Sequence, residues 1–478
     1  MNSSYLGTLY NSIYDFCLAN NINTELFVVG VDRINFSDVK SFNKLVENEL
    51  DYLLPKMMLH DQEPVMYQQQ KEKWDLFYYK LTKIDRRIII CHSELNSPEL
   101  DALCLRYDAI PCYFFSNGIL AQEWYGKYRY LPDLNKIYIK NKIPRLKYKF
   151  SCMNRLTGQQ RLYRPILSKM LMDIVDHQDL MLSCNVIDPV DSTHVSARQD
   201  IMLPAHHRAI LNSLSSMDTP ITINVPEWDL ADDLTLPNTS FDANRHFFEN
   251  TFCHIATETL YYGTCLHLTE KSFRPIINRR PFILAGPPNS LEYLRNYGFK
   301  TFSGFWDESY DQETDGNKRL DKIRDLIQHI NSMSFTEMEA TLAKMDDILE
   351  YNFNHFYTGF AEKIDDELWI NLELAVEQYH RQGTKPGWLL DRINQLSETE
   401  LQQLIRDDQP GLDYYNLYSD IKYDDFQKSL TKQAVESKDW KFIDQNRISY
   451  LLAHEFKFKH DSSKDEILAA VMAFTNLT

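Results

Sequence analysis

The segment Thr269-Glu270-Lys271 places a hydroxyl, a carboxylate and an ammonium group at the start of a predicted helix. The Thr269 hydroxyl is suited to cap that helix, and the helix dipole favours the Glu270 carboxylate in the first turn. The dipole opposes Lys271, which is favourable there only when an anion lies between its ammonium group and the backbone N–H groups. Glu270 is then placed to accept hydrogen bonds from ribose hydroxyls. The pattern favours a site for a nucleotide diphosphate over the alternative, a cap with a solvated charge pair.

Short apolar runs separated by helix-length segments make up the first part of the chain. The runs cover 25–31, 56–61, 86–93 and 110–117, and helices are expected over 37–54 and 97–108. This alternation predicts a parallel sheet with crossover helices, in which chemistry gathers at the carboxyl ends of the strands. The polar residues at those ends are His60, Asp61, His92, Ser93, Ser116 and Asn117.

A second α/β alternation begins at residue 148. Strands are predicted over 148–154, 179–184, 220–225, 252–259 and 281–286, and helices over 159–174, 289–298 and 317–331. Pro275 lies in the second turn of the helix after Thr269, so that helix is expected to be kinked or displaced at its start. Ser334 and Glu337 form a capping-box pattern, and the chain from 384 is charged and helical. We predict domains at 1–145 and 146–383, followed by an appended α-helical segment at 384–478.

The composition limits the class of protein. The chain has 478 residues and a formal net charge of -17, so it does not attract polyanions through its global field. None of its eight cysteines has a C-x-x-C partner, which predicts reduced thiols in an intracellular protein. No apolar run approaches the ~20 residues that span a bilayer, and the first residues lack a signal-peptide pattern. These features predict a soluble protein of the cytoplasm, or of the host cytoplasm if the chain is encoded by a phage.

Several familiar catalytic motifs are absent from the sequence. It contains no G-x-x-x-x-G-K-[ST], G-x-G-x-x-G, H-E-x-x-H or G-x-S-x-G pattern. The pair His206-His207 has no cysteine or acidic residue at ligand spacing, so we interpret it as the polar start of a helix and not as a zinc site. No D-x-D triplet is present to hold a metal–diphosphate. We expect no metal and no cofactor, and any nucleotide chemistry is predicted to be metal-independent.

The Thr-Glu-Lys segment also carries a resemblance to a known family. "FCHIATETLYYGTCLHLTEKSFRPI" followed by "RRPFILAGPPNSLEYLRNYGFKTF" resembles the donor-binding half of GT-B glycosyltransferases, especially the fucosyltransferase type and the exostosin-like proteins. In that pattern a strand ends in a carboxylate, Thr-Glu-Lys follows about ten residues later, and an αβ step ends in P-F-I-x-x-G. Glu258, Thr269, Glu270 and Lys271 match it, whereas Glu258-Thr259 stands in place of the usual Glu-Asn.

A second, weaker resemblance begins in the first α/β region. "HDQEPV", "CHSELNS", "SNGILAQEWYGKYRY" and "FSCMNRLTGQQRLYRPIL" resemble segments of tailed-phage proteins that are described as glycosyltransferases. Together the two resemblances cover about residues 20–360. They imply a GT-B-like fold, in which two Rossmann-like domains face a cleft, and the transfer of a hexose or pentose from a nucleotide sugar to a hydroxyl. Two alternatives stay open: a phage enzyme that glycosylates a hydroxylated or hydroxymethylated DNA base, and a non-catalytic virion or scaffold protein on the same fold.

The resemblance suggests roles for further polar residues. Asn154 and Arg155 end the first strand of the second domain, where Arg155 is suited to bind phosphate through its guanidinium group. The helix that follows carries two more arginines, Arg161 and Arg164. Asn154 and Arg161 join Arg155 among the residues predicted to bind the nucleotide sugar. Transfer with inversion needs a base that removes the acceptor proton, and the strand end at "HDQEP" offers two carboxylates for it. The catalytic candidates are Asp61 and Glu63, with Glu94, Glu123 and His92 in reserve.

Residues 127–149 are basic in an acidic chain. They hold eight cations and one acid, Asp133, a net of +7, so the remainder carries -17 minus +7, or -24. Tyr128, Tyr130, Tyr138 and Tyr148 are interleaved with the cations, as in stretches that stack nucleic-acid bases. The stretch is either a solvated connector or a contact surface for a polyanionic acceptor such as DNA. Its cations are Lys127, Arg129, Lys136, Lys140, Lys142, Arg145, Lys147 and Lys149.

Overall fold

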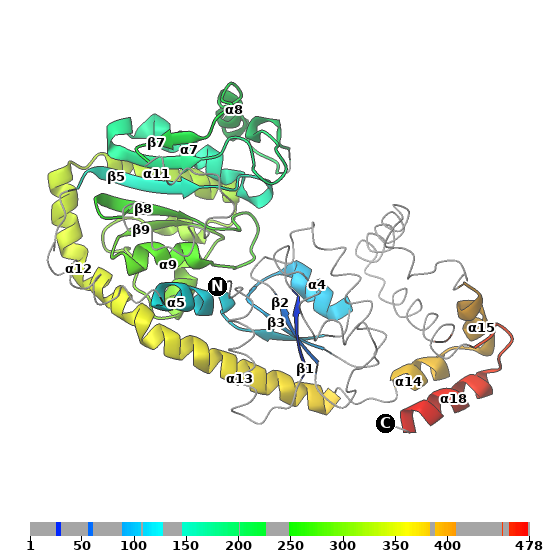
Figure 1. Cartoon of the computed structure of the whole chain (residues 1–478). Coiled ribbons are helices and arrows are strands. Elements are labelled where there is room, and N and C mark those ends of the chain that lie inside the picture. The colour runs from blue at the N-terminus through cyan, green and yellow to red at the C-terminus, as the bar shows by residue number, and fades with distance from the viewer. Residues whose placement is uncertain are drawn as a thin grey trace. The chain divides into compact units, whose positions relative to one another are not determined.

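The computed structural model is a mixed α/β protein with two sheets that are mainly parallel (Figure 1). It describes residues 25–29, 56–60, 88–106, 109–127, 146–199, 201–225, 248–382, 388–407, 452 and 458–476. Contacts between residues divide the chain into two compact units. The first consists mainly of Tyr113–Trp369 together with Ser93–Ser97, and the second mainly of Tyr10–His92, Pro98–Cys112 and Ile370–Thr478.

The first unit is built on a five-stranded sheet in the order β7-β6-β5-β8-β9. Its strands are β5 (Tyr148–Asn154), β6 (Leu180–Cys184), β7 (Ile221–Ile223), β8 (Thr251–Thr257) and β9 (Phe282–Ala285). All pairs are parallel except β6 with β7, which is antiparallel. Every residue of β8 and β9 is buried, as expected for strands that helices cover on both faces.

Helices connect and cover these strands. The 3₁₀ turn η3 (Gln159–Arg161) and helix α7 (Tyr163–Ile174) follow β5, and α8 (Ala205–Ser213) follows β6. Helix α9 (Glu270–Ile277) follows β8, and α10 (Ser290–Asn296) follows β9. Three longer helices come next: α11 (Gly316–Asn331), α12 (Phe335–Tyr357) and α13 (Gly359–Gln382). Helix α7 packs against α8 and α11, while α9 packs against β8, α12 and α5 (Ser116–Lys127). The predicted capping box of Ser334 and Glu337 is confirmed at the start of α12.

A cluster of aromatic rings fills the space between α5, α9, α12 and α13. The Phe273 ring lies 5.1 Å from that of Phe360 and 5.8 Å from that of Phe115. Phe356 and Phe299 complete the cluster, with ring centroids 5.4 and 5.8 Å from Phe273. All five side chains are buried. Because large aromatic surfaces dominate core energetics, this cluster fixes the position of α9 and hence of its first turn.

The second unit contains the other sheet, in the order β1-β2-β3-β4. Its strands are β1 (Glu25–Val29), β2 (Lys56–His60), β3 (Ile88–His92) and β4 (Ile110–Tyr113), and the pairs β1–β2 and β2–β3 are parallel. Helix α4 (Pro98–Arg106) joins β3 to β4. Further along the chain, α14 (Trp388–Gln395), α15 (Glu398–Asp407) and α18 (Lys464–Asn476) share a hydrophobic cluster around Leu401, Leu452 and Ile467.

The predicted strands and helices are confirmed where the structure describes them, with two corrections. The strand expected over 110–117 ends at Tyr113, because Ser116 and Asn117 begin α5. The helix expected over 159–174 is split into η3 and α7. The helix expected over 37–54 lies outside the described residues. The domain limits at 145 and 383 stay predictions. Among the described helices, none is long and apolar enough to cross a membrane.

Candidate functional site

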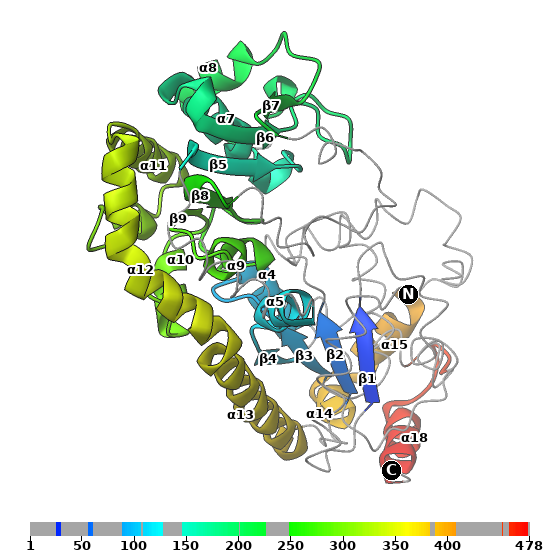
Figure 2. The same ribbon diagram turned by 60° about the vertical axis from the view of Figure 1, so that its left-hand side comes forward.

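The sheet of the first unit reverses its direction of winding between β5 and β8. The chain leaves β5 through α7 and reaches β6 on one side, whereas β8 lies on the other side of β5 and leads through α9 to β9 (Figures 1 and 2). In open α/β sheets, ligands bind at such a switch point, beyond the carboxyl ends of the two strands. Asn154 and Thr257 are the last residues of these strands. The candidate site is therefore at the ends of β5 and β8.

Asn154 links the two strands at this point. Its Oδ1 accepts a hydrogen bond of 2.6 Å from the Thr257 hydroxyl, and its Nδ2 donates to Ser168 Oγ of α7 at 3.2 Å. The side chain is buried. Asn154, predicted to bind the nucleotide sugar, thus uses its amide to join β5, β8 and α7, and a buried amide that is already bonded has little to offer a ligand.

Glu258 directly after β8 holds the start of α9. Its Oε1 accepts from the Thr269 backbone N–H at 3.1 Å and from the Ser272 hydroxyl, while its Oε2 accepts from the Thr269 hydroxyl at 2.6 Å and the Thr259 N–H at 3.2 Å. The carboxylate is completely buried. Four donors match the roughly four lone-pair positions of an ionised carboxylate, so Glu258 positions α9 and has no acceptor left for a base or ribose.

The predicted capping role of the Thr269 hydroxyl is wrong, although Thr269 is the N-cap residue. Its side chain makes no capping hydrogen bond to the helix backbone. The hydroxyl donates to Glu258 Oε2 instead. A hydrogen bond to an ionised carboxylate is stronger than the bond between two neutral groups that a cap would form. Pro275 lies inside α9, which nevertheless begins at Glu270, where the sequence predicts it.

Lys271 and Glu270 form an ion pair in the first turn of α9. Lys271 Nζ lies 2.9 Å from Glu270 Oε1 and 3.2 Å from Thr269 Oγ1. Burial acts to raise the pKa of Glu270, but the cations of Lys271 and Arg274 outweigh it, so the pKa is lowered and the carboxylate is ionised at neutral pH. About a third of the Lys271 side chain remains exposed, at 31%. The ammonium group is partly neutralised and still accessible to a second anion.

A small pocket lies beside this ion pair. It measures about 20 Å³, and Lys271 and Arg274 line it from one turn of α9. Burial, with the Arg274 charge, lowers the pKa of the lining residue His254 to about 3, so its ring is neutral. Two cations and the Glu270 carboxylate give a local charge of +1. The other lining residues are Met153, Ile255, Ala256 and Thr257. A volume of this size holds about one water molecule, so the pocket can anchor one oxygen of an anion whose remainder lies outside it.

The arginines near β5 differ in their surroundings. Arg155 is exposed, and its backbone carbonyl accepts from Asn185 Nδ2 at 2.8 Å, which fixes the loop but leaves the guanidinium group in solvent. Arg161 is half-buried in η3. Arg164, in contrast, is buried and donates to the carbonyls of Leu156, Thr257 and Glu258. These hydrogen bonds hold the end of β8 in place from the protein interior.

The predicted catalytic residues Asp61 and Glu63 lie outside the described residues. So does the Glu123 side chain, although its backbone belongs to α5. Glu94 is described and buried, and it accepts from Ser97 Oγ at 2.7 Å and from Cys265 Sγ at 3.6 Å. His92, the remaining reserve, is buried at the end of β3.

A buried row of Ser93, His267 and Asn117 has the residue types of a nucleophile and its base. The Ser93 Oγ and Asn117 Nδ2 atoms each lie 3.3 Å from one nitrogen of the His267 ring. Because the Asn117 amide nitrogen can only donate, His267 Nε2 accepts and its Nδ1–H donates to Ser93. In this tautomer the ring nitrogen that faces Ser93 carries a proton, so the row forms a buried hydrogen-bond network.

Arg274 and Thr257 also belong to this site and were not predicted from the sequence. Arg274 follows Lys271 by three residues, and this spacing on a predicted helix was the signal that could have revealed a second cation. Thr257 carried no such signal, because its partner Asn154 lies 103 residues away. Most of the basic stretch 127–149 is outside the described residues; at its end, Lys149 donates to the Asn331 carbonyl at 2.7 Å. Comparisons of the chain with protein-family models, with curated proteins and with solved structures found no match for it.

Proposed function

We propose that the protein is a glycosyltransferase of the GT-B type, and that the first unit holds a nucleotide-sugar diphosphate at the ends of β5 and β8. The observation that carries the proposal is the pair of cations, Lys271 and Arg274, which line a pocket at the point where the sheet reverses its winding. Both the position and the charge suit a phosphate group. The proposed role of Lys271 is to bind one oxygen of the diphosphate.

The supporting residues give this site a rigid frame. Glu258 and the Asn154–Thr257 bond hold the start of α9 against the two strand ends, so that the ammonium group of Lys271 needs little rearrangement when an anion binds. Arg155 is exposed next to the end of β5 and is proposed as a second contact to the diphosphate. Glu270 is proposed to orient Lys271 through their ion pair and not to contact the ribose, since its carboxylate is buried.

In the proposed reaction the bond between the anomeric carbon and the diphosphate oxygen breaks while a bond to the acceptor oxygen forms. The nucleoside diphosphate leaves with the electron pair, and the acceptor proton passes to a base. Asp61 and Glu63 remain the residues proposed for that base. Replacing the true base with its amide is expected to lower kcat by roughly 10²–10⁴-fold while donor binding is unchanged. Full activity in both Asp61→Asn and Glu63→Gln would place the base elsewhere.

Binding of UDP and GDP to the full chain tests the donor site first. A ligand that binds only the native state raises stability by about 2.7 kcal/mol at 100 times its Kd, which a thermal-shift titration detects. Lys271→Ala is expected to weaken binding by roughly 10–100-fold, because a charge-assisted contact is worth about 1.5–3 kcal/mol. The control is Lys318→Ala, which removes an exposed lysine from the first turn of α11 and should leave binding unchanged.

Two results would count against the donor site. One is the absence of any shift with either nucleotide, which would favour the scaffold alternative. The other is equal binding by wild type and Lys271→Ala, which would move the phosphate contact to another residue. If nucleotides bind, release of the nucleoside diphosphate from a nucleotide sugar in the presence of hydroxymethylated DNA, a protein or a glycan identifies the acceptor. The DNA alternative also predicts binding that weakens steeply with salt.

A further inference from the structure

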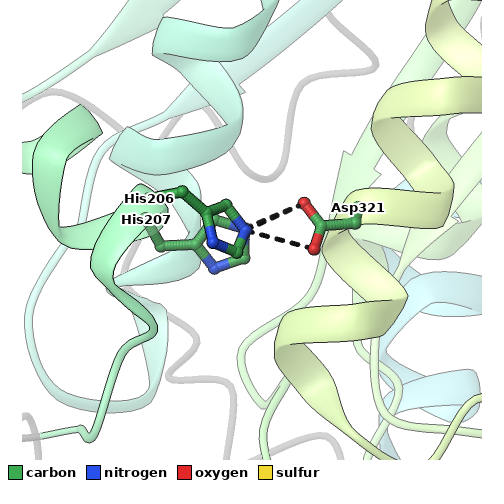
Figure 3. A group of neighbouring side chains, drawn as sticks. All are labelled: His206, His207 and Asp321. Carbon is green, nitrogen blue, oxygen red and sulfur yellow. Dashed lines mark hydrogen bonds and ion pairs between the residues drawn. The ribbon is translucent and has the colours of Figure 1, made fainter.

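Two neighbouring histidines at the start of α8 face an aspartate on α11. Nε2 of His206 lies 3.2 Å from Asp321 Oδ2, and Nε2 of His207 lies 3.2 Å from Asp321 Oδ1. One donor atom from each of the three residues lies within 4.8 Å of the others. Figure 3 shows both imidazole rings reaching from one helix toward the carboxylate on the other. Three groups that commonly ligate metals therefore converge on one point between two helices.

Asn317 contacts the ring nitrogen of His207 that points away from Asp321. This contact determines the tautomer of His207, that is, which of its two ring nitrogens carries the proton. Nδ1 lies 3.1 Å from Asn317 Oδ1, an amide oxygen that can only accept. Nδ1 must therefore carry the proton, and Nε2 of the neutral ring presents a lone pair to a carboxylate oxygen. Two acceptors at 3.2 Å repel each other unless a positive species lies between them. A bound cation, or a second proton on the fully buried imidazole, is such a species.

The separations suit a metal of the zinc class. Bonds of about 2.0–2.1 Å in a tetrahedral arrangement place ligand atoms about 3.3 Å apart. The distances from Asp321 Oδ1 to Nε2 of His206 and of His207, 3.3 and 3.2 Å, are close to this value. The His206 side chain is 52% exposed, so its ring can turn to shorten the distance to His207. Its exposure also leaves room for water as a fourth ligand.

We propose that His206, His207 and Asp321 bind a divalent cation of the zinc class and so fasten α8 to α11. This inference does not depend on the proposed glycosyl transfer. Imidazole nitrogens with one carboxylate favour zinc, cobalt or nickel over magnesium and calcium. Asn317 contacts a ligand and not the metal. Its Oδ1 accepts from Nδ1 of His207 and so holds the ring in the tautomer that ligates through Nε2.

Two nearby features oppose a cation at this site and are expected to lower its affinity for a metal. Arg324 Nη1 lies 3.2 Å from Asp321 Oδ1 and competes for that carboxylate. The positive end of the α8 dipole also opposes a cation in the first helical turn. We therefore expect weaker binding than in four-ligand structural sites. Removing the competing charge by Arg324→Gln should leave the affinity equal to that of wild type or raise it.

The test is a titration of the chelator-treated full chain with Zn²⁺ and with Co²⁺. Wild type should bind one ion at this site, seen by calorimetry and by the visible absorption of Co²⁺. His206→Gln and Asp321→Asn should each weaken binding by about 10-fold or more, and Asn317→Ala by about 10–100-fold. His329→Gln is the matched control, because it removes an exposed histidine from the same α11 and should keep the wild-type affinity.

Unchanged affinity in both His206→Gln and Asp321→Asn would overturn the proposal, as would the absence of saturable binding by wild type. Either result would assign the contact to a protonated imidazole instead of a metal. His206 is half exposed, so His206→Gln is expected to fold, and circular dichroism of each variant without metal verifies this. A metal bound by cysteine would be recognised by intense thiolate-to-Co²⁺ absorption, which the proposed nitrogen and oxygen ligands do not produce.

Discussion

Two carboxylates in the first unit each lie against the first turn of a helix, in opposite surroundings. Glu258 is completely buried, and only hydroxyl and backbone N–H groups contact its oxygens. Asp321 is 27% exposed and lies beside two imidazoles and Arg324. All hydrogen-bond acceptor positions of the buried carboxylate are used by neutral groups of the protein, so its role is structural. The exposed one has ionisable partners that a solute can replace, and such a site is suited to binding.

The largest effect is expected from removing the buried carboxylate. Glu258→Ala leaves the Thr269 N–H and hydroxyl and the Ser272 hydroxyl without their acceptor in a dry environment. Since each unsatisfied buried donor costs about 1–3 kcal/mol, we expect the free energy of unfolding to fall by about 3 kcal/mol or more. Urea denaturation measures this change.

The matched control is Glu292→Ala, which removes an exposed carboxylate from the first turn of α10. Its unfolding free energy should stay within about 0.5 kcal/mol of wild type. An equally small change in Glu258→Ala would mean that the start of α9 is held by its aromatic core alone, and the contrast between the two carboxylates would lose its basis.

A second test concerns His254, the buried histidine of β8. Because the pKa of His254 is lowered from 6.5 to about 3, the unfolded chain takes up a proton between these values and the native protein does not. This contribution is present above pH 6.5 and is lost as the pH falls toward 3. The group should remove about 2 kcal/mol of stability between pH 7 and pH 5.

His254→Gln should therefore lose less stability than wild type over this pH range in urea denaturation. The comparison between variants cancels the contribution of the carboxylates that both chains share. The surface variant His329→Gln should follow the wild-type pH dependence. If His254→Gln follows it too, His254 is accessible to protons in the native protein, and the interior of this region is less closed than the structure implies.

A smaller effect is expected at the link between β5 and β8. Thr257→Val keeps the shape of the side chain but removes the donor to Asn154 Oδ1, a bond of 2.6 Å. The expected loss is about 1–2 kcal/mol of unfolding free energy, because the buried amide oxygen loses its donor. Thr257→Ser, which keeps the hydroxyl, should recover part of that loss, and urea denaturation of both variants measures the difference. A Thr257→Val variant as stable as wild type would show that this hydrogen bond does not contribute to stability.

The smallest effect is expected at Asp321 in the absence of metal. Its partners His206 and Arg324 are partly exposed, and ion pairs of this kind contribute about 0–1 kcal/mol. Asp321→Asn should therefore lower the unfolding free energy by less than about 1 kcal/mol when a chelator is present. With saturating Zn²⁺ the gap between wild type and variant should widen, since a ligand that binds only the native state stabilises it. A large loss without metal would make Asp321 an architectural residue like Glu258.

Much of the local structure follows from the sequence alone. The runs at 148–154 and 252–259 are apolar enough to form buried strands, and both are strands within two residues of the predicted limits. The start of α9 at Glu270 and the capping box at Ser334 were also predictable. In each case the determining pattern lies within a window of a few residues, because hydrophobic period and capping are properties of neighbours along the chain.

The candidate sites depend on partners that are distant in sequence. Asp321 lies 114 residues from His207, so the sequence around His206-His207 contains no acid at ligand spacing. Glu258 lies 11 residues before Thr269, the N-cap residue of the helix that it holds, and the cap predicted from neighbouring residues assigned this task to the Thr269 hydroxyl. These pairs form because the strand order places β8 beside β5 and because α8 and α11 both pack against α7. Only tertiary packing sets those neighbours, since burial rewards any pairing that closes the core and no short sequence window encodes which one does.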